Sequence, residues 1–77
     1  MTRFFFDYAA NDRSLFDYHG DYFHSARAAL EFAEAIAAYL KNSLSDDWIG
    51  WSIEVRNVSG NRVGAVSINN SALIATF

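Results

Sequence analysis

The amino-acid sequence predicts an α+β fold in the order ββαββ, with one long helix packed on one face of a mainly antiparallel four-stranded sheet. Three segments carry this prediction: residues 51–68 alternate in polarity about a turn at Gly60, residues 26–44 have helical periodicity, and residues 3–8 are too aromatic for a loop. A chain of 77 residues has room for one core, so residues 1–77 are expected to form a single domain.

The first two expected strands lie at residues 3–8 and 14–18. Alternation along the first strand places Phe4, Phe6 and Tyr8 on one face, and Arg3, Phe5 and Asp7 on the other. A polar turn joins the two strands, and Gly20 closes the second one as the residue expected at positive φ.

The expected helix covers residues 26–44, a segment without Gly or Pro. Ser25 is a suitable N-cap, because its hydroxyl can accept a hydrogen bond from a free backbone N–H group of the first turn. The residues expected to face the sheet share one arc of the helix: Ala26, Ala29, Leu30, Ala33, Ile36, Ala37, Leu40 and Leu44. Small alanines on this arc would let the helix approach the sheet closely.

A second helical flank, with Ala28, Phe32, Ala35 and Tyr39, allows two interpretations. Its aromatic side chains either wrap around the sheet edge and complete the core, or form an interface with another protein.

The last two expected strands, residues 50–57 and 62–69, form a hairpin. A register with Asn57 opposite Arg62 sets Val55 against Gly64 and Ile53 against Val66, and it is preferred over a three-residue loop because it buries more apolar volume. Residues 70–77 fit either a fifth short strand or a helical turn.

Several of these motifs, taken in order, resemble a small bacterial family of unknown function, DUF6894. Members of that family open with Arg, aromatics and an acidic residue, as residues 3–7 do, and continue with an Asp-x-x-Gly turn, matched by residues 17–20. An Ala-rich helix and a Trp-x-hydrophobic-Glu-Val strand follow, matched by residues 26–44 and 51–55. The resemblance covers residues 2–68 and implies a fold, but it carries no activity.

Composition narrows the classes of partner. The chain has no Cys, so neither disulfides nor thiolate metal sites can support a core this small, and self-association is one remaining source of stability. Thirteen aromatic residues exceed what one helix and four strands are expected to hide.

The net charge of −3 and the scattered cations argue against a nucleic-acid partner. No apolar run fits a signal peptide or a membrane span, so the expected location is cytoplasmic.

Asp17, His19, Asp21 and His24 are candidate ligands for a divalent metal, because carboxylate and imidazole together suit such ions. The competing interpretation is favoured: the aspartates flank Gly20 in a turn, where Asp commonly bonds backbone N–H groups. No serine lies in a Gly-x-Ser-x-Gly elbow, and we expect neither catalysis nor a cofactor.

The sequence therefore predicts a non-enzymatic protein-interaction or self-assembly module, with a homodimer or another protein as its partner. Phe32 and Tyr39 on the helix and Phe5 on the outer sheet face are the expected interface residues. One alternative is a regulatory partner-binder that resembles HicB-type antitoxin domains over residues 20–40. A metal-binding module that uses the two histidines is the other alternative.

Overall fold

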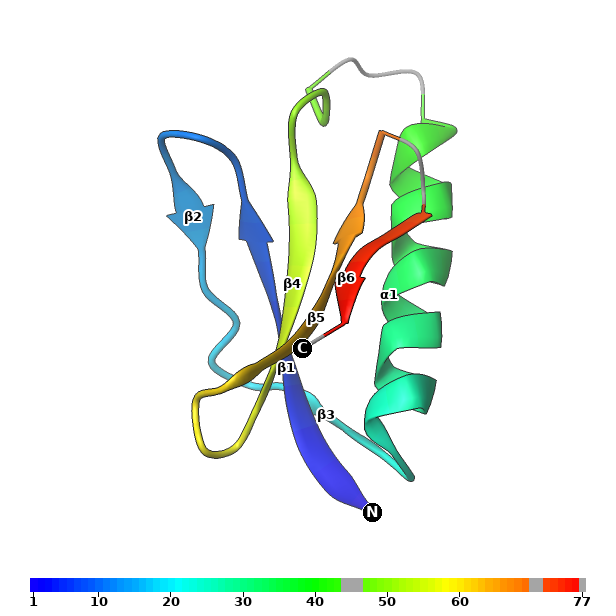
Figure 1. Ribbon diagram of the computed structural model, residues 1–77. Coiled ribbons are helices and arrows are strands. Elements are labelled where there is room, and N and C mark those ends of the chain that lie inside the picture. The colour runs from blue at the N-terminus through cyan, green and yellow to red at the C-terminus, as the bar shows by residue number, and fades with distance from the viewer. Residues whose placement is uncertain (44–46, 70–71, 77) are drawn as a thin grey trace.

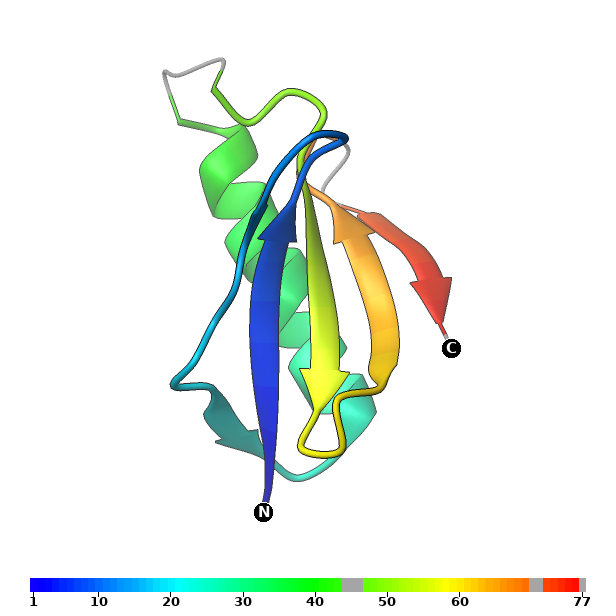
Figure 2. The ribbon, with the colours of Figure 1, turned by 90° about the vertical axis from the view of Figure 1, so that its left-hand side faces the viewer.

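The computed structural model describes residues 1–43, 47–69 and 72–76. This part of the chain forms one helix and one antiparallel sheet of six strands, with the helix against one face (Figures 1 and 2). Among these residues, no helix is both long and apolar enough to cross a membrane. The elements are β1 (Thr2–Ala9), β2 (Ser14–Leu15), β3 (Asp21–Phe23), α1 (Ala26–Lys41), β4 (Ser52–Asn57), β5 (Arg62–Ser67) and β6 (Ala72–Thr76).

The predicted α+β class with one helix on one face of an antiparallel sheet is confirmed, but the sheet has six strands in place of four. The two additional strands are β3, which pairs with the N-terminal half of β1, and β6, which pairs with β5. Of the two conformations that the sequence left open for residues 70–77, residues 72–76 adopt the strand, and residues 70, 71 and 77 lie outside the described residues. The sheet order is β2-β1-β4-β5-β6, and β3 lies beside β1 on the same edge as β2.

Four elements are shorter than predicted, and one of them is the strand expected over residues 62–69, which ends at Ser67. The strand expected over residues 14–18 ends at Leu15. Beyond it, the carboxylate of Asp17, and not a backbone carbonyl, accepts the N–H of Phe6 in β1. The helix ends at Lys41, where the N–H groups of Asn42 and Ser43 close the last turn, and Leu44 lies outside the described residues. The strand expected over residues 50–57 begins at Ser52.

The hairpin register is confirmed at its apolar positions, with Ile53 opposite Val66 and Val55 opposite Gly64. Toward the turn it differs from the prediction: Arg56, and not Asn57, lies opposite Arg62. An irregularity between Val55 and Arg56 causes the shift, because an extra residue in one strand of an antiparallel pair displaces every pair beyond it.

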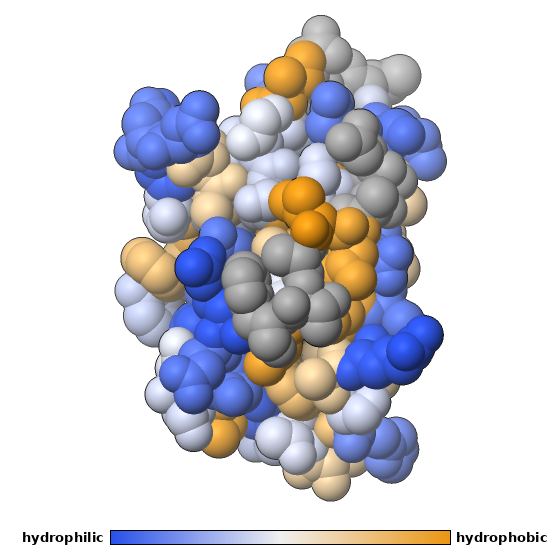
Figure 3. Space-filling model, in the orientation of Figure 1, coloured by the Kyte–Doolittle hydropathy of each residue, from blue (hydrophilic) through white to orange (hydrophobic). Residues whose placement is uncertain are grey.

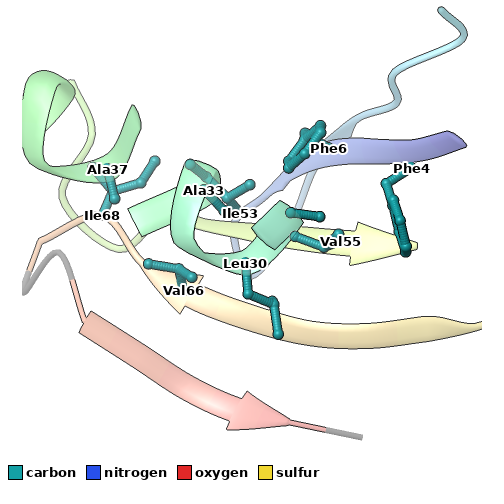
Figure 4. Packing of buried hydrophobic residues seen from close by; sticks show 10 residues of the cluster. Phe4, Phe6, Leu30, Ala33, Ala37, Ile53, Val55, Val66 and Ile68 are labelled. Carbon is teal, nitrogen blue, oxygen red and sulfur yellow. The ribbon is translucent and has the colours of Figure 1, made fainter. Parts of the chain in front are cut away.

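The core lies between α1 and the middle of the sheet (Figure 4). Ala29, Ala33 and Ala37 of α1 are completely buried. Their small side chains bring the helix close to β4 and β5. The largest fully buried side chains are Ile53 and Val55 of β4, Val66 of β5, and Ile68 immediately after β5. The Ser25 hydroxyl accepts a hydrogen bond from the Ala28 N–H at 3.1 Å, so the predicted N-cap is confirmed.

Replacement of Ala33 by Leu should test this close packing. Leu and Ala have similar helix propensity, so the expected loss of about 1–3 kcal/mol in the free energy of unfolding comes from overpacking against the sheet. Ala35→Leu is the matched control, because Ala35 is exposed on the same helix and its variant should stay within about 0.5 kcal/mol of wild type. Urea denaturation followed by circular dichroism measures both variants, and equal losses would contradict close packing at Ala33.

Candidate functional site

The segment between β2 and β3 runs along the edge of β1 (Figure 2). Between these two short strands a side chain, and not a backbone ladder, attaches the segment to β1. One carboxylate oxygen of Asp17 accepts the backbone N–H of Phe6 at 3.1 Å. The other oxygen accepts the N–H groups of His19 at 3.0 Å and Gly20 at 3.1 Å. Asp17 thus orders its own turn and also replaces a strand partner for β1.

A second carboxylate, Asp7, holds the backbone of Asp17 from the outer face of the sheet. Asp7 is only 4% exposed and is paired with Arg56 of β4, with Nε–Oδ2 at 2.6 Å and Nη2–Oδ1 at 3.1 Å. Asp7 also accepts the Asp17 N–H at 2.9 Å, while Arg56 Nη2 donates to the Asp17 carbonyl at 2.8 Å. Both backbone polar groups of Asp17 are therefore bound to one ion pair, in which Asp7 is buried and Arg56 is partly exposed.

Phe5 packs beneath two guanidinium groups on this outer face. The Cζ atoms of Arg3 and Arg56 lie 4.9 and 4.7 Å from its ring centroid, within the range of cation–π attraction. Arg3 Nε also donates to the His19 carbonyl at 2.8 Å. Phe5, one of the predicted interface residues, is half-buried here and lies on the sheet face opposite Phe32 and Tyr39.

The turn requires a glycine at position 20. Gly20 has φ +68°, and a Cβ atom there would lie 2.6 Å from the Phe4 carbonyl oxygen and 3.0 Å from the Phe5 ring. The absence of a side chain at Gly20 therefore lets the segment between β2 and β3 lie directly against β1.

The electrostatics of this segment keep Asp17 ionised. Burial alone would raise the pKa of Asp17, but hydrogen bonds from the N–H groups of Gly20, His19 and Phe6, together with the nearby His19, lower it below its usual value. The pKa of Tyr8 is raised by burial and by the charge of Asp17, so its phenol stays neutral at physiological pH. The pKa of Arg56 is raised chiefly by its hydrogen bond to Asp7.

The ordered segment forms one wall of an apolar groove of about 460 Å³ at the β1 edge. Phe6 and Tyr8 of β1 line it from the sheet, Leu15 and Phe16 from the segment, and Phe32 and Ile36 from α1, with Asp17, Gly20 and Asp21 completing the lining. Leu15, Phe16 and Phe32 are 57%, 58% and 42% exposed. The groove therefore offers large apolar side chains to solvent from both walls.

Phe32 packs against the core, as one interpretation of its sequence pattern expected, and it is also exposed in the groove, while its role in an interface stays a prediction. Its ring packs on Phe6 and Phe23, with centroids 5.5 and 5.3 Å apart, and its outer part lines the groove. Tyr39, its predicted companion, is 78% exposed on the same helix but does not line the groove. The sequence pattern gave Leu15 and Phe16 no place in the site, because only the Asp17 turn brings them opposite the helix.

The four candidate metal ligands have other surroundings. Both carboxylate oxygens of Asp17 accept backbone N–H groups, and Asp21 accepts the N–H of Tyr22 at 2.8 Å. Within residues 1–43, 47–69 and 72–76, no three His, Cys, Asp or Glu side chains are arranged to hold a metal ion. The structure thus does not bring His19 and His24 together with the aspartates as a metal site.

Asp17→Asn should lower the free energy of unfolding by about 1–3 kcal/mol at neutral pH, because the amide has one acceptor oxygen for three N–H groups. Since folding lowers the pKa of Asp17, its stabilising contribution is complete above the unfolded pKa and is lost as the pH falls through the folded pKa. The difference between wild type and variant, measured by urea denaturation, should therefore shrink below about pH 4.

Asp12→Asn is the control for that experiment. Asp12 is exposed, and its ion pair with Arg13, with Oδ1 and Nε 3.6 Å apart, lies on the surface, where such pairs contribute little to stability. A pH-independent difference for Asp17→Asn would contradict the ionised hydrogen-bonding role.

Gly20→Ala should destabilise the fold more than Gly60→Ala, by at least about 1 kcal/mol in thermal or urea unfolding. Both glycines have positive φ, so both variants carry the same kind of backbone strain. Only the added methyl at position 20 meets another part of the backbone, since a Cβ at Gly60 has nothing within 4 Å. Equal losses would show that contact with β1 is not what requires glycine at position 20.

In a comparison with protein families, the family described as Domain of unknown function (DUF6894) matches residues 3–69. The matched residues include the aromatic strand, the Asp17 turn, α1 and the β4–β5 hairpin, and they end before β6. Comparisons with curated proteins and with solved structures found no match. The resemblance inferred from the sequence motifs is confirmed, and the chain belongs to the DUF6894 family.

Proposed function

We propose that this protein is a small interaction module whose groove binds an apolar polypeptide segment flanked by Lys or Arg. One observation carries the proposal: Leu15, Phe16 and Phe32 are exposed around a hollow of about 460 Å³ whose two walls belong to different elements. Large aromatic side chains are enriched at the centres of protein interfaces, where they supply contact area at little entropic cost.

The shape of the groove favours a polypeptide over an enclosed small molecule. Its volume would hold two or three side chains, and the exposed walls leave it open along the surface for a chain that continues past it. Phe32 also rests on Phe6 and Phe23, so this wall is held in place before a partner arrives. Pre-organised walls reduce the entropic cost of association.

The charge of the groove supports basic residues beside the apolar anchors. Asp17 and Asp21 line it, and no Lys or Arg is among its lining residues. The lowered pKa of Asp17 keeps that carboxylate ionised. A partner cation near this end would gain favourable electrostatic attraction, which improves specificity and association rate.

The same observations favour binding over catalysis. Both oxygens of Asp17 are engaged by backbone N–H groups, and the raised pKa of Tyr8 disfavours its use as a base. The antitoxin-like alternative concerns the identity of the partner and could use this groove. Nothing in the site favours the metal-binding alternative over the interaction module.

Selection of random dodecamer peptides displayed on phage tests the proposal directly. Peptides enriched on wild-type protein should carry at least two large apolar residues and flanking Lys or Arg. Their affinity, measured by fluorescence anisotropy, should fall about tenfold or more in Phe32→Ser, because this change removes an aromatic side chain from the groove wall. Tyr22→Ser is the matched control, since Tyr22 is 56% exposed but lies outside the groove lining.

Selection of no peptide, or of peptides that bind Phe32→Ser as tightly as wild type, would contradict binding in the groove. Tyr39→Ser separates the groove from the wider helical flank predicted from the sequence. A loss of binding confined to Tyr39→Ser would move the interface along α1. If Phe32→Ser instead abolished self-association of the wild-type protein, the occupant would be a second copy.

A further inference from the structure

The two edges of the sheet differ in how they are finished. On the β1 side, β2, β3 and the Asp17 carboxylate together occupy the backbone groups of the edge. On the opposite side, β6 ends the strand order and pairs only with β5 among the described residues (Figure 2). One edge is therefore closed by the fold, and the other offers backbone donors and acceptors.

The side chains of β6 carry few of the features that discourage pairing. Its sequence, Ala-Leu-Ile-Ala-Thr, has no charge and no proline, two of the features that natural edge strands use against association, although its pairing with β5 has one irregularity. Leu73 is 43% exposed and Ile74 is 61% exposed. The register shift in β5–β6 leaves Ile74 without a partner residue in β5, so this apolar side chain is not held in the β5–β6 ladder.

An apolar hollow of about 300 Å³ adjoins β6. Leu30, Val63 and Leu73 line it together with Ala26, and Figure 3 shows hydrophobic surface gathered where β6 meets α1. Arg27 lies among the lining residues near the start of α1, whereas Glu34 lies seven residues further along the helix. Glu31 also lines the hollow and forms an ion pair with Arg27, with Nε and Oε2 3.7 Å apart, so charged side chains of α1 border an apolar floor of Leu30, Val63 and Leu73.

We propose that β6 pairs antiparallel with β6 of a second copy of this chain, about a two-fold axis, and joins the two sheets into one. About a two-fold axis, the free backbone N–H and C=O groups of β6 in one copy meet the same groups of β6 in the other copy. Each copy then both donates and accepts hydrogen bonds, and an edge without charged side chains brings no like charges together.

This pairing is separate from the groove. The groove lies at the β1 edge and β6 at the opposite edge, so a β6-paired dimer would present two open grooves at its far ends. Because the DUF6894 match ends at residue 69, the proposal concerns this chain and not the whole family.

Sedimentation velocity of the full chain over a concentration series tests the pairing. Wild type should be a dimer, Ile74→Lys a folded monomer by circular dichroism, and Val58→Lys still a dimer, because Val58 is equally exposed in the β4–β5 turn (63%). A wild type that stays monomeric to about 1 mM would overturn the proposal. A dimer that survives Ile74→Lys would overturn it too.

A second variant covers the case in which Ile74→Lys fails to fold. The chain has no native Cys, so Ile74→Cys gives one attachment site for a nitroxide spin label. Paired β6 strands should bring the two labels of a dimer within about 20 Å, a few strand spacings, whereas labels at Val58→Cys should lie further apart. Longer separation at position 74 would reject the β6 interface. Phe32→Ser should leave the dimer intact, so loss of peptide binding and loss of dimerisation are distinguishable.

Discussion

The burial of the Asp7 carboxylate is the constraint on which the β1 edge depends. A buried charge costs several kcal/mol unless it is paired and hydrogen-bonded, and here Arg56 and the Asp17 N–H meet that requirement together. Arg56 can do so because the β1–β4 register places it opposite Phe5, one diagonal step from Asp7. The ion pair therefore joins β4 to the turn that follows β2. The Asp7 charge is fully compensated only when both β4 and this turn are in place.

This arrangement explains how a small sheet presents a shaped apolar surface without losing order at its edge. The Asp17 carboxylate ends the β2 pairing early and directs Leu15 and Phe16 toward α1, where Phe32 supplies the facing wall. The helix is held by its small alanines against β4 and β5, so both walls of the groove are set by the same sheet. Among the described residues, no side-chain hydrogen bond of this kind lies at the β6 edge, and that contrast is the basis for proposing different partners for the two edges.

Local patterns in the sequence were sufficient for the helix and the hairpin. The Ser25 cap, the alanine stripe and the alternation about Gly60 each act within a few residues, and each appears in the structure. Patterns of this kind could not reveal the Asp7–Arg56 pair, whose members are 49 residues apart, or the pairing of β3, a strand of only three residues. The groove was not predicted: Phe32 was identified from its helical position as an interface residue, and the place of Phe16 depends on the Asp17 turn.

Amide hydrogen exchange, followed residue by residue by NMR, tests the central claim most directly. If the Asp17 carboxylate replaces a strand partner, the Phe6 N–H should exchange as slowly as the ladder amides shared by β1 and β4, and the Gly20 N–H should be protected beside it. Rapid exchange at Phe6 with a protected β1–β4 ladder would show that the segment is not held to the sheet. The groove would then lack a fixed wall, and the account of the binding surface would fail with it.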